Sequence, residues 1–187
     1  MSSPVAVVLA DLAGALEGIG AGWYLFGAQA ALLRGSRRLT ADVDVTLLPS
    51  SHDTSALVER LERRGFALRV KADEPFLEAT RVLPITHVAT NMPVDVVLGG
   101  PGLEELFLES SETLEIEGVR IRVPTAEHLV VMKLLAGREK DLDDAAAIGR
   151  ARELDHAAIG ELVESIAVGL GEDEIRRALA ELHTRLS

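Results

Sequence analysis

The chain has no cysteine, and aromatic residues make up only 3% of its 187 residues. Without cysteine, disulfide bonds and thiolate metal sites are excluded. The scarcity of aromatic side chains disfavours a platform on which single-stranded nucleic acid would stack its bases. No apolar run approaches the roughly 18 to 20 residues of a membrane span, and the N-terminus lacks the features of a signal peptide. We therefore expect a cytoplasmic protein without a membrane segment.

Basic residues are also few: 19 Lys and Arg residues stand against 30 Asp and Glu residues, which gives a formal net charge of −11. This balance disfavours broad, non-specific binding to nucleic acid, which needs clustered Lys and Arg side chains. A local basic patch nevertheless remains at Arg34, Arg37 and Arg38. Hydrophobic residues make up 48% of the chain, enough for a packed core in one domain or in a domain with a helical appendage.

Hydrophobic patterns predict strands and helices in alternation up to about residue 123, and helices alone from Pro124 on. The expected strands are 23–26, 42–48, 66–71, 79–89, 93–98, 112–117 and 119–123, the last two as a hairpin around Glu117-Gly118. The expected helices are 4–18, 28–34, 54–64, 103–108, 126–136 and three within 139–187. Asp73-Glu74-Pro75 and Asn91-Met92-Pro93 are typical of turns. The order indicates a mixed α/β fold, with a sheet domain at 1–123 and a helical subdomain at 124–187 packed on it.

Two carboxylates stand one residue apart in the segment Thr40-Ala41-Asp42-Val43-Asp44-Val45. On a strand, Asp42 and Asp44 point to one face and the two valines to the other. Like charges this close repel each other unless a cation lies between them. Mg²⁺ prefers carboxylate oxygens and also binds substrate phosphates, so the pair is a candidate metal site. The alternative is two acids that end a strand in solvent.

The segment before this pair runs from a buried strand, Trp23-Tyr24-Leu25-Phe26, through Gly27 and Ala28 into a helix. In this arrangement backbone N–H groups and a helix N-terminus face an anion, so both residues are candidates for phosphate binding. A simple turn is the alternative. Arg38 and Thr40 lie just before the acidic pair, and they either hold their loop or contact phosphate.

A third carboxylate, Asp95, lies between apolar residues in the strand predicted at 93–98. An acid in a buried strand must be paired, bound to a cation or placed at the strand end. If this strand neighbours 42–48, Asp95 joins Asp42 and Asp44, and three converging carboxylates can hold two Mg²⁺ ions. Asp95 would also be the candidate general base. An isolated acid at a turn or sheet edge is the alternative.

The segments Phe26-Gly27-Ala28, Asp42-Val43-Asp44 and Val94-Asp95-Val96 together resemble the nucleotidyltransferase superfamily that shares the DNA polymerase β catalytic fold. The superfamily signature is a hydrophobic residue, Gly, then Gly or Ser, a spacer of about a dozen residues and Asp-x-Asp. Ala28 stands where Gly or Ser is usual, which removes a hydroxyl that could contact phosphate. The resemblance implies a twisted mixed sheet flanked by helices, Mg²⁺ as cofactor and an NTP as donor substrate.

The segment from Val123 to Asp144 resembles the region after the sheet in AbiEii-type nucleotidyltransferases, which are toxins of type IV toxin–antitoxin systems. In that family a Lys on the helix after the sheet and an Asp shortly afterwards belong to the active site. These positions match Lys133 and either Asp141 or Asp144. The resemblance covers roughly 22–148.

The residues themselves agree in part with this assignment. Lys133 falls within an apolar run, where its ammonium group needs an anionic partner such as a triphosphate or the Asp cluster. Arg138 would add a second cation to the phosphates. A Lys at a helix edge and a solvated, salt-bridged helix start are the respective alternatives. The five histidines show no metal-ligand spacing, and a structural role is expected for His87 rather than a position facing the site.

Taken together, these patterns favour a Mg²⁺-dependent, ATP- or other NTP-using transferase that moves a nucleoside monophosphate to a hydroxyl acceptor. The acceptor stays open between a tRNA 3′ end, a protein hydroxyl and a small antibiotic-like alcohol. Two rival hypotheses remain: a catalytically idle binding or regulatory module with this fold, which the altered Ala28 would support, and a toxin held by a cognate antitoxin protein. The first helix and the C-terminal helices would serve either as an interface for a homodimer or partner, or as ordinary core.

Overall fold

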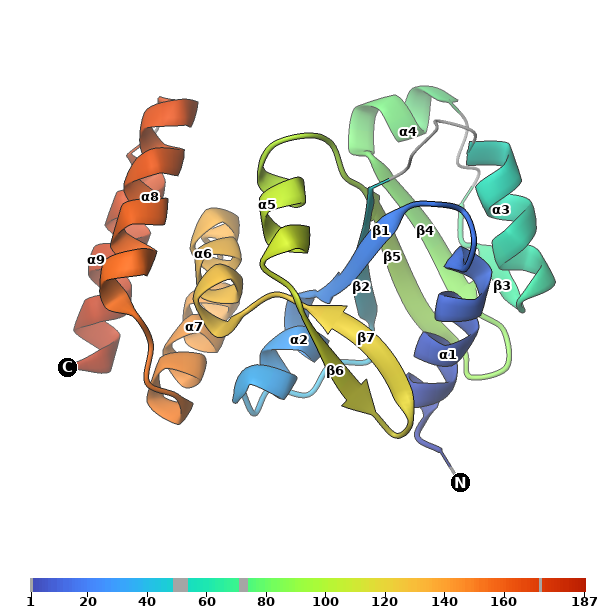
Figure 1. The fold of residues 1–187 in the computed structure, drawn as a ribbon, viewed down its shortest axis with the longest axis horizontal. Coiled ribbons are helices and arrows are strands. Elements are labelled where there is room, and N and C mark those ends of the chain that lie inside the picture. Colours follow the sequence, from blue (N-terminus) through green and yellow to red (C-terminus); the bar gives the residue numbers. More distant parts are fainter. Residues whose placement is uncertain (1, 49–53, 71–73, 172) are drawn as a thin grey trace. The chain divides into compact units, whose positions relative to one another are not determined.

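A computed structural model describes residues 2–48, 54–70, 74–171 and 173–187. The helices of this part are α1 (Pro4–Leu16), α2 (Gly27–Arg34), α3 (Thr54–Arg63), α4 (Glu74–Thr80), α5 (Leu103–Glu109), α6 (Ala126–Ala136), α7 (Glu139–Ala151), α8 (His156–Leu170) and α9 (Glu174–Leu186). The strands are β1 (Gly22–Phe26), β2 (Val43–Leu48), β3 (Phe66–Leu68), β4 (Val82–His87), β5 (Met92–Leu98), β6 (Glu112–Ile116) and β7 (Val119–Val123) (Figure 1). The mixed α/β fold predicted from the sequence is confirmed.

The elements form two compact units. The first comprises Met1–Gly27 and Thr40–Val123, and the second comprises Ala28–Leu39 and Pro124–Ser187. The helical unit therefore contains most of α2 and the segment after it, besides the C-terminal helices that the sequence pattern groups together. The chain passes from the first unit to the second at Gly27 and returns just before Asp42.

The first unit is built on a sheet with the strand order β1-β2-β5-β4-β3 among the described residues. β2 and β5 run parallel, and the other neighbouring strands run antiparallel. The parallel pairing follows from the long connection between β2 and β5, which holds α3, β3, α4 and β4. The strands predicted at 42–48 and 93–98 are neighbours, which meets the condition on which the grouping of Asp95 with the acidic pair depends.

The buried face of this sheet follows directly from the alternation of residue types. Val43, Val45 and Leu47 of β2 are at most 1% exposed, whereas Asp44 between them is partly exposed. The helix α1 contacts α3 and β7, and its Val8, Leu9 and Leu12 side chains are fully buried. The apolar face is thus the core of the unit, and the opposite face is left for the carboxylates.

A separate two-stranded sheet of β6 and β7 is the predicted hairpin. Glu117 and Gly118 both have positive φ values, of 49° and 87°, at its turn. A two-residue hairpin turn of this kind matches the right-handed twist of the strands and favours glycine. The prediction around Glu117-Gly118 is confirmed.

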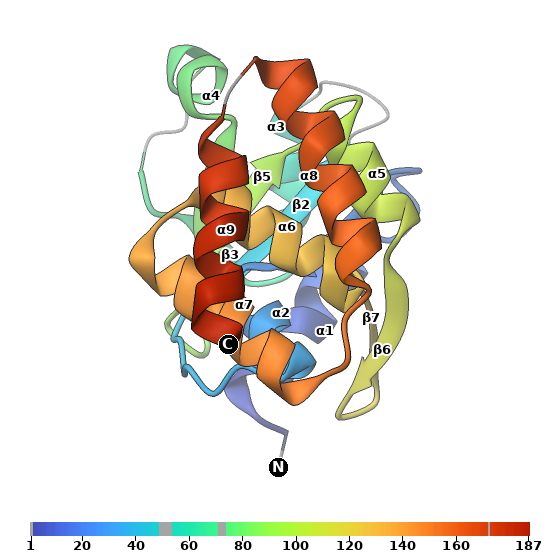
Figure 2. The ribbon, with the colours of Figure 1, turned by 90° about the vertical axis from the view of Figure 1, so that its left-hand side faces the viewer.

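In the second unit, α6 packs against α7, α8 and α9, and α9 also contacts α7 and α8. Figure 2 shows α8 and α9 side by side, with α6 and α7 behind them. Leu129, Val130 and Val131 of α6 are 0% exposed, which explains why this helix is apolar on most sides. Arg34 of α2 donates through Nε and Nη2 to the carbonyl oxygen of Pro124, 2.9 and 2.6 Å away, and so ties α2 to the start of α6.

The prediction was wrong for the turn at Asp73-Glu74-Pro75 and for a strand beginning at residue 79. Asp73 lies outside the described residues, but Glu74–Thr80 is the helix α4. A proline in the first turn of a helix is well tolerated, because the N–H group that it lacks has no helical partner there. β4 begins only at Val82, since Arg81 takes a positive φ of 53°. β3 ends at Leu68 rather than at 71, and residue 71 is not described.

Candidate active site

Asp44 of β2 and Asp95 of β5 are direct partners across the two parallel strands. Residues paired in this way point to the same face of a sheet, so both carboxylates lie on the partly open face of the first unit. The valines that flank the two acids are 0% exposed and belong to the opposite face: Val43, Val45, Val94 and Val96. The sequence placed each acid on a predicted strand, and the register of the two strands puts them side by side.

Gly27 lies beside this pair, at the point where β1 ends and α2 begins. Phe26, the residue before it, is the partner of Asp44 in the β1–β2 register. Gly27 has a positive φ of 66°, and a Cβ atom at this position would lie 1.9 Å from Asp44 Oδ2. Only glycine fits, because any side chain would overlap the carboxylate. The backbone therefore approaches Asp44 without a covering side chain.

Asp42 directly precedes β2, and its side chain is exposed. Its backbone N–H donates to Thr40 Oγ1 at 3.4 Å. The described residues contain no group of three or more His, Asp or Glu side chains arranged to hold a metal ion. Two carboxylates in one row still fit Mg²⁺, which often takes one or two protein carboxylates and completes its shell with phosphates and water.

Arg69 is a neighbour of Asp95 that the sequence reasoning did not single out. Its Nη2 forms an ion pair with Asp95 Oδ1, and the two side chains are 35% and 39% exposed. Its backbone N–H donates to the carbonyl oxygen of Pro84, which is the strand partner of Asp95. The only available signal was a basic residue at the end of a short strand, which does not predict a partner two strands away.

In the helical unit, Lys133 of α6 lies between two aspartates of α7. Its Nζ is 3.0 Å from Asp141 Oδ1 and 2.9 Å from Asp144 Oδ2, and all three residues are at most 5% exposed. The sequence named all three residues as candidates, and the structure joins them directly. The anionic partner that Lys133 requires within its apolar run is therefore provided by the chain itself.

Two arginines and a serine complete this buried cluster. Asp144 accepts hydrogen bonds from Ser36 Oγ at 2.8 Å and from Arg38 Nη2 at 2.7 Å, and Asp141 accepts one from Arg138 Nε. Three cationic side chains therefore contact the two carboxylates. Arg38 and Arg138 are the more exposed of them, with side chains 36% and 63% exposed. Ser36, which is 4% exposed, was missed because its partner lies 108 residues away.

Burial and hydrogen bonding act in opposite directions on the pKa values of the two aspartates. Burial raises the pKa of Asp141, but hydrogen bonds from Arg138 and Lys133 outweigh it and the pKa is lowered from its ordinary value. For Asp144, burial likewise raises the pKa, and hydrogen bonds from Arg38, Lys133 and Ser36 bring it below its ordinary value. Both carboxylates are therefore ionised at neutral pH.

His87 does not belong to the carboxylate face. It lies three residues beyond Pro84, the partner of Asp95, and odd spacing on a strand places it on the opposite face. There its Nε2 is 3.1 Å from Asp11 Oδ2 of α1, and its Nδ1 is 2.9 Å from Thr90 Oγ1. These contacts agree with the structural role expected for this residue.

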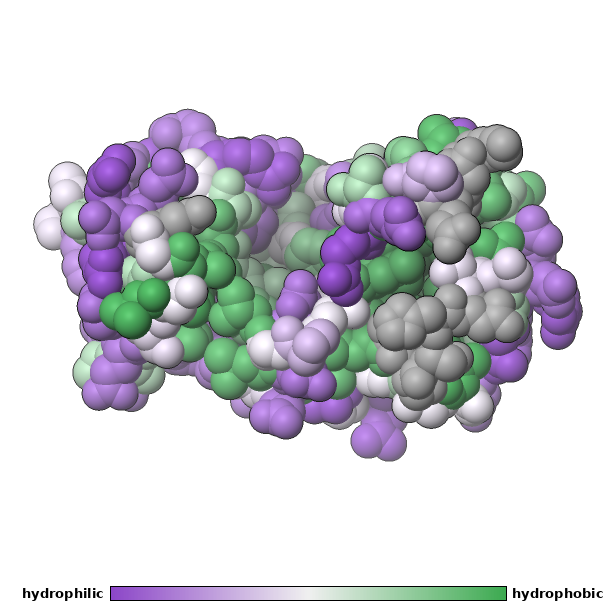
Figure 3. All heavy atoms as spheres, turned by 90° about the horizontal axis from the view of Figure 1, so that it is seen from above, coloured by the Kyte–Doolittle hydropathy of each residue, from purple (hydrophilic) through white to green (hydrophobic). Residues whose placement is uncertain are grey.

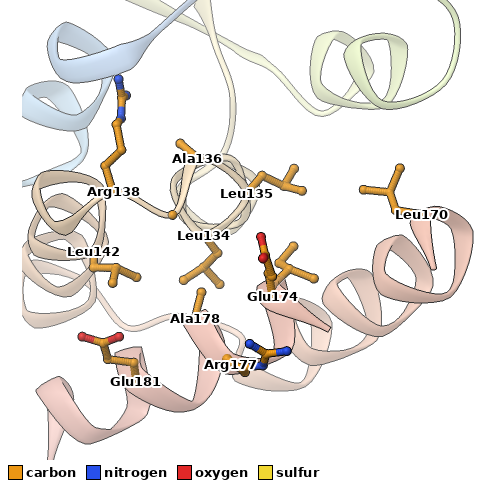
Figure 4. Close-up of a pocket in the computed structure, with 12 residues that line it drawn as sticks. Leu134, Leu135, Ala136, Arg138, Leu142, Leu170, Glu174, Arg177, Ala178 and Glu181 are labelled. Carbon is orange, nitrogen blue, oxygen red and sulfur yellow. The ribbon is translucent and has the colours of Figure 1, made fainter. Parts of the chain in front are cut away.

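The helical unit also contains an open pocket of about 390 Å³, and both apolar and charged side chains line it. Figure 4 shows Glu174 pointing in among Leu134, Leu135 and Ala178, whereas Arg138 extends away from them. Nearby on α8, Val168 and Leu170 are 69% and 53% exposed. In the space-filling view, hydrophobic and hydrophilic residues alternate over the C-terminal helices at the left (Figure 3).

Residues 21–183 match the family described as nucleotidyltransferase of unknown function (DUF6036). The match covers most of the chain, so this protein belongs to that family of nucleotidyltransferase enzymes. The finer resemblance to AbiEii-type nucleotidyltransferases stays a prediction. A comparison with curated protein sequences finds no match.

Solved structures with the same fold come from other nucleotidyltransferases. The antibiotic-resistance factor ANT(2'')-Ia is 12% identical, with a TM-score of 0.53 over 97% of this chain and 92% of that one. An antigenic nucleotidyltransferase-like protein from Paracoccidioides brasiliensis is 16% identical, with a TM-score of 0.55 over 96% and 94%. The lincosamide antibiotic adenylyltransferase LnuA, bound to lincomycin, is 15% identical, with a TM-score of 0.52 over 81% and 99%. At these identities the likeness establishes the nucleotidyltransferase fold.

In the described part of the chain, no helix combines the length and apolar character needed to cross a membrane.

Proposed function

We propose that this protein transfers a nucleoside monophosphate from an NTP to a hydroxyl group of an acceptor molecule, with Mg²⁺ as its cofactor. The observation that carries this proposal is the pairing of Asp44 with Asp95 on one sheet face, next to the bare backbone of Gly27. These are the positions at which the sequence resembles the nucleotidyltransferase signature. Membership of the family supports the general reaction, and the residue roles below are our assignment.

In the proposed reaction, the acceptor oxygen attacks the α-phosphorus of the NTP. A new O–P bond forms, the bond from the α-phosphorus to the bridging oxygen breaks, and pyrophosphate leaves. Asp95 accepts the proton of the acceptor hydroxyl. Asp44 and Asp95, with Asp42 at the edge of the same strand, are the residues that would hold Mg²⁺, which supplies positive charge against the charge of the phosphates. Gly27 and Ala28, at the N-terminus of α2, would donate backbone N–H groups to phosphate oxygens.

The buried cluster of Lys133, Asp141 and Asp144 gives the helical unit a second proposed role. Lys133 already forms ion pairs with both aspartates, so we assign it the role of holding these two side chains in position. We assign the direct contact with the triphosphate to Arg38 and Arg138. A guanidinium group offers two parallel N–H donors to a phosphate, and it keeps its charge at any working pH. Thr40, between Arg38 and Asp42 in the sequence, would donate a hydrogen bond from its hydroxyl group to the triphosphate.

A small alcohol is the acceptor that we favour over an RNA end or a protein hydroxyl. A net charge of −11 repels a polyanion and attracts a cationic small molecule. Two of the proteins with this fold act on or bind small antibiotics: one structure holds ANT(2'')-Ia with adenylyl-2''-tobramycin, and another holds LnuA with lincomycin.

A second candidate rests on the resemblance of the segment from Val123 to Asp144 to AbiEii-type toxins. In that case the acceptor is a tRNA 3′ end or a protein, and a cognate antitoxin protein would inhibit the transferase activity. Expression of the native chain would then arrest growth, and the Asp44→Ala variant would not. Growth that is unaffected by the native chain at high expression would remove this candidate.

The position of a radioactive label in the NTP tests the reaction type directly. The protein is incubated with Mg²⁺, each of the four NTPs in turn, and either a panel of aminoglycoside- and lincosamide-like alcohols or a cell extract. An α-labelled NTP is expected to label the acceptor, and a γ-labelled NTP is expected to release labelled pyrophosphate. Label that reaches the acceptor only from the γ-position would make the protein a kinase, and no NTP binding in calorimetry would favour the idle module.

A further inference from the structure

We infer that Arg69 competes with the metal ion for Asp95 and so sets the affinity of the carboxylate pair for divalent cations. This inference rests on the metal role proposed for Asp44 and Asp95. It goes beyond that role, because neither the sequence pattern nor the family resemblance assigns anything to Arg69.

The position of Arg69 follows from the register of the sheet. Pro84 of β4 is the strand partner of Asp95, and Arg69 donates its backbone N–H to the Pro84 carbonyl oxygen at 3.0 Å. Pro84, Asp95 and Asp44 therefore form one row across β4, β5 and β2, and Arg69, directly after β3, lies at the end of this row. From this position the guanidinium group forms an ion pair with Asp95 Oδ1.

The strength of this ion pair suits a reversible contact. Both side chains are about one third exposed, and exposed ion pairs contribute little to the stability of a fold. The pair is therefore a poor candidate for a permanent structural support. It does, however, place a positive charge against an oxygen that a metal ion would need, and two cations this close repel each other. A divalent cation that binds Asp95 must displace the guanidinium group or share the carboxylate with it.

The free energy of an exposed ion pair sets the size of the expected effect. Replacing Arg69 by Gln keeps a polar side chain of similar reach but removes its charge. The affinity for a divalent cation should then rise about two- to fivefold at low salt. The gain should shrink in 1 M salt, where charges farther apart than about 3 Å are screened. Arg69→Lys keeps the charge and should stay near the native affinity.

Mn²⁺ titration, followed by the electron paramagnetic resonance signal of the free ion, measures this affinity without any turnover. Mn²⁺ prefers the same carboxylate oxygens as Mg²⁺. Arg63→Gln is the matched control, because Arg63 forms an exposed ion pair with Glu59 on α3 and its loss changes the net charge equally. Arg69→Gln is expected to bind Mn²⁺ more tightly than both the native protein and the control. In an Asp95→Asn background the same change should have no effect.

The outcomes separate this inference from the proposed function. If native protein binds Mn²⁺ and Asp95→Asn weakens that binding, but Arg69→Gln binds no more tightly than the Arg63→Gln control, the competition is refuted while the metal site stands. If the native protein fails to bind Mn²⁺ even with an NTP present, the proposed function and this inference both fall.

Discussion

Asp44 and Gly27 approach each other so closely that position 27 has room only for glycine: a Cβ atom on Gly27 would lie 1.9 Å from Asp44 Oδ2. Gly27→Ala should therefore push the carboxylate or the backbone away, with a loss of folding stability and of nucleotidyl transfer. Gly18→Ala is the matched control, because Gly18 has a similar φ of 74° and would meet no atom within 4 Å. The control should lose about 1 kcal/mol from backbone strain alone. Urea denaturation of the two variants measures the difference, and equal losses would contradict the close approach.

Lys133→Met leaves two buried carboxylates without their shared ammonium group. Breaking a buried pair by removing one partner costs about 3 to 5 kcal/mol of folding stability. We expect a loss in this range in chemical denaturation, whereas Lys140→Met, at an exposed position on α7, should change stability by less than about 0.5 kcal/mol. A native-like midpoint for Lys133→Met would mean that the ion cluster does not support the helical unit.

The lowered pKa values of Asp141 and Asp144 predict a loss of stability in acid. In the unfolded chain such groups titrate near 3.8, whereas in the folded protein they hold their charge to lower pH. The unfolded state therefore binds more protons as the pH falls below about 4, and the stability that these groups contribute is lost there. Stability measured between pH 5 and pH 3 should fall more steeply in the native protein than in the triple variant Lys133→Met, Asp141→Leu, Asp144→Leu. Parallel curves would refute this assignment.

The raised pKa of Tyr24 predicts that folding stability also depends on pH in the alkaline range. Burial raises its pKa to about 12, with a hydrogen bond to Thr46 opposing the shift and the charge of Glu104 adding to it. Because the phenol of the unfolded chain ionises near 10, the unfolded state loses its proton first. Folding stability should therefore decline between about pH 10 and pH 12, less so in Tyr24→Phe. Ultraviolet titration of the phenol in the folded protein checks this, and ionisation near pH 10 would contradict it.

Local patterns were enough to predict most elements and the two carboxylate strands. Asp44 and Asp95 were recognisable because each interrupts an apolar strand, and alternation along a strand fixes the face on which it lies. Lys133 was recognisable because an ammonium group within an apolar run requires a partner, whereas Asp141 and Asp144 were named from the family resemblance. The sequence did not reveal that Asp141 and Asp144 both hold that lysine.

Local sequence patterns could not predict contacts between residues that lie far apart in the sequence. Arg69 meets Asp95 only through the order and register of the strands, and Ser36 meets Asp144 only because α2 packs in the helical unit. Neither residue type carries a local signal for its partner. The helix α4 was missed for the opposite reason, because Pro75 is a strong local signal for a turn and is also acceptable in the first turn of a helix.

The proposed reaction depends most on Asp44, and the transfer of label from an α-labelled NTP in the Asp44→Asn variant tests this dependence most directly. The substitution keeps the size of the side chain and removes its charge, so the fold should persist while transfer falls by at least about 100-fold. Asp143→Asn, at an exposed position of α7, is the control and should keep native turnover. A folded Asp44→Asn variant that transfers label at the native rate would contradict the assignment of this carboxylate to the reaction.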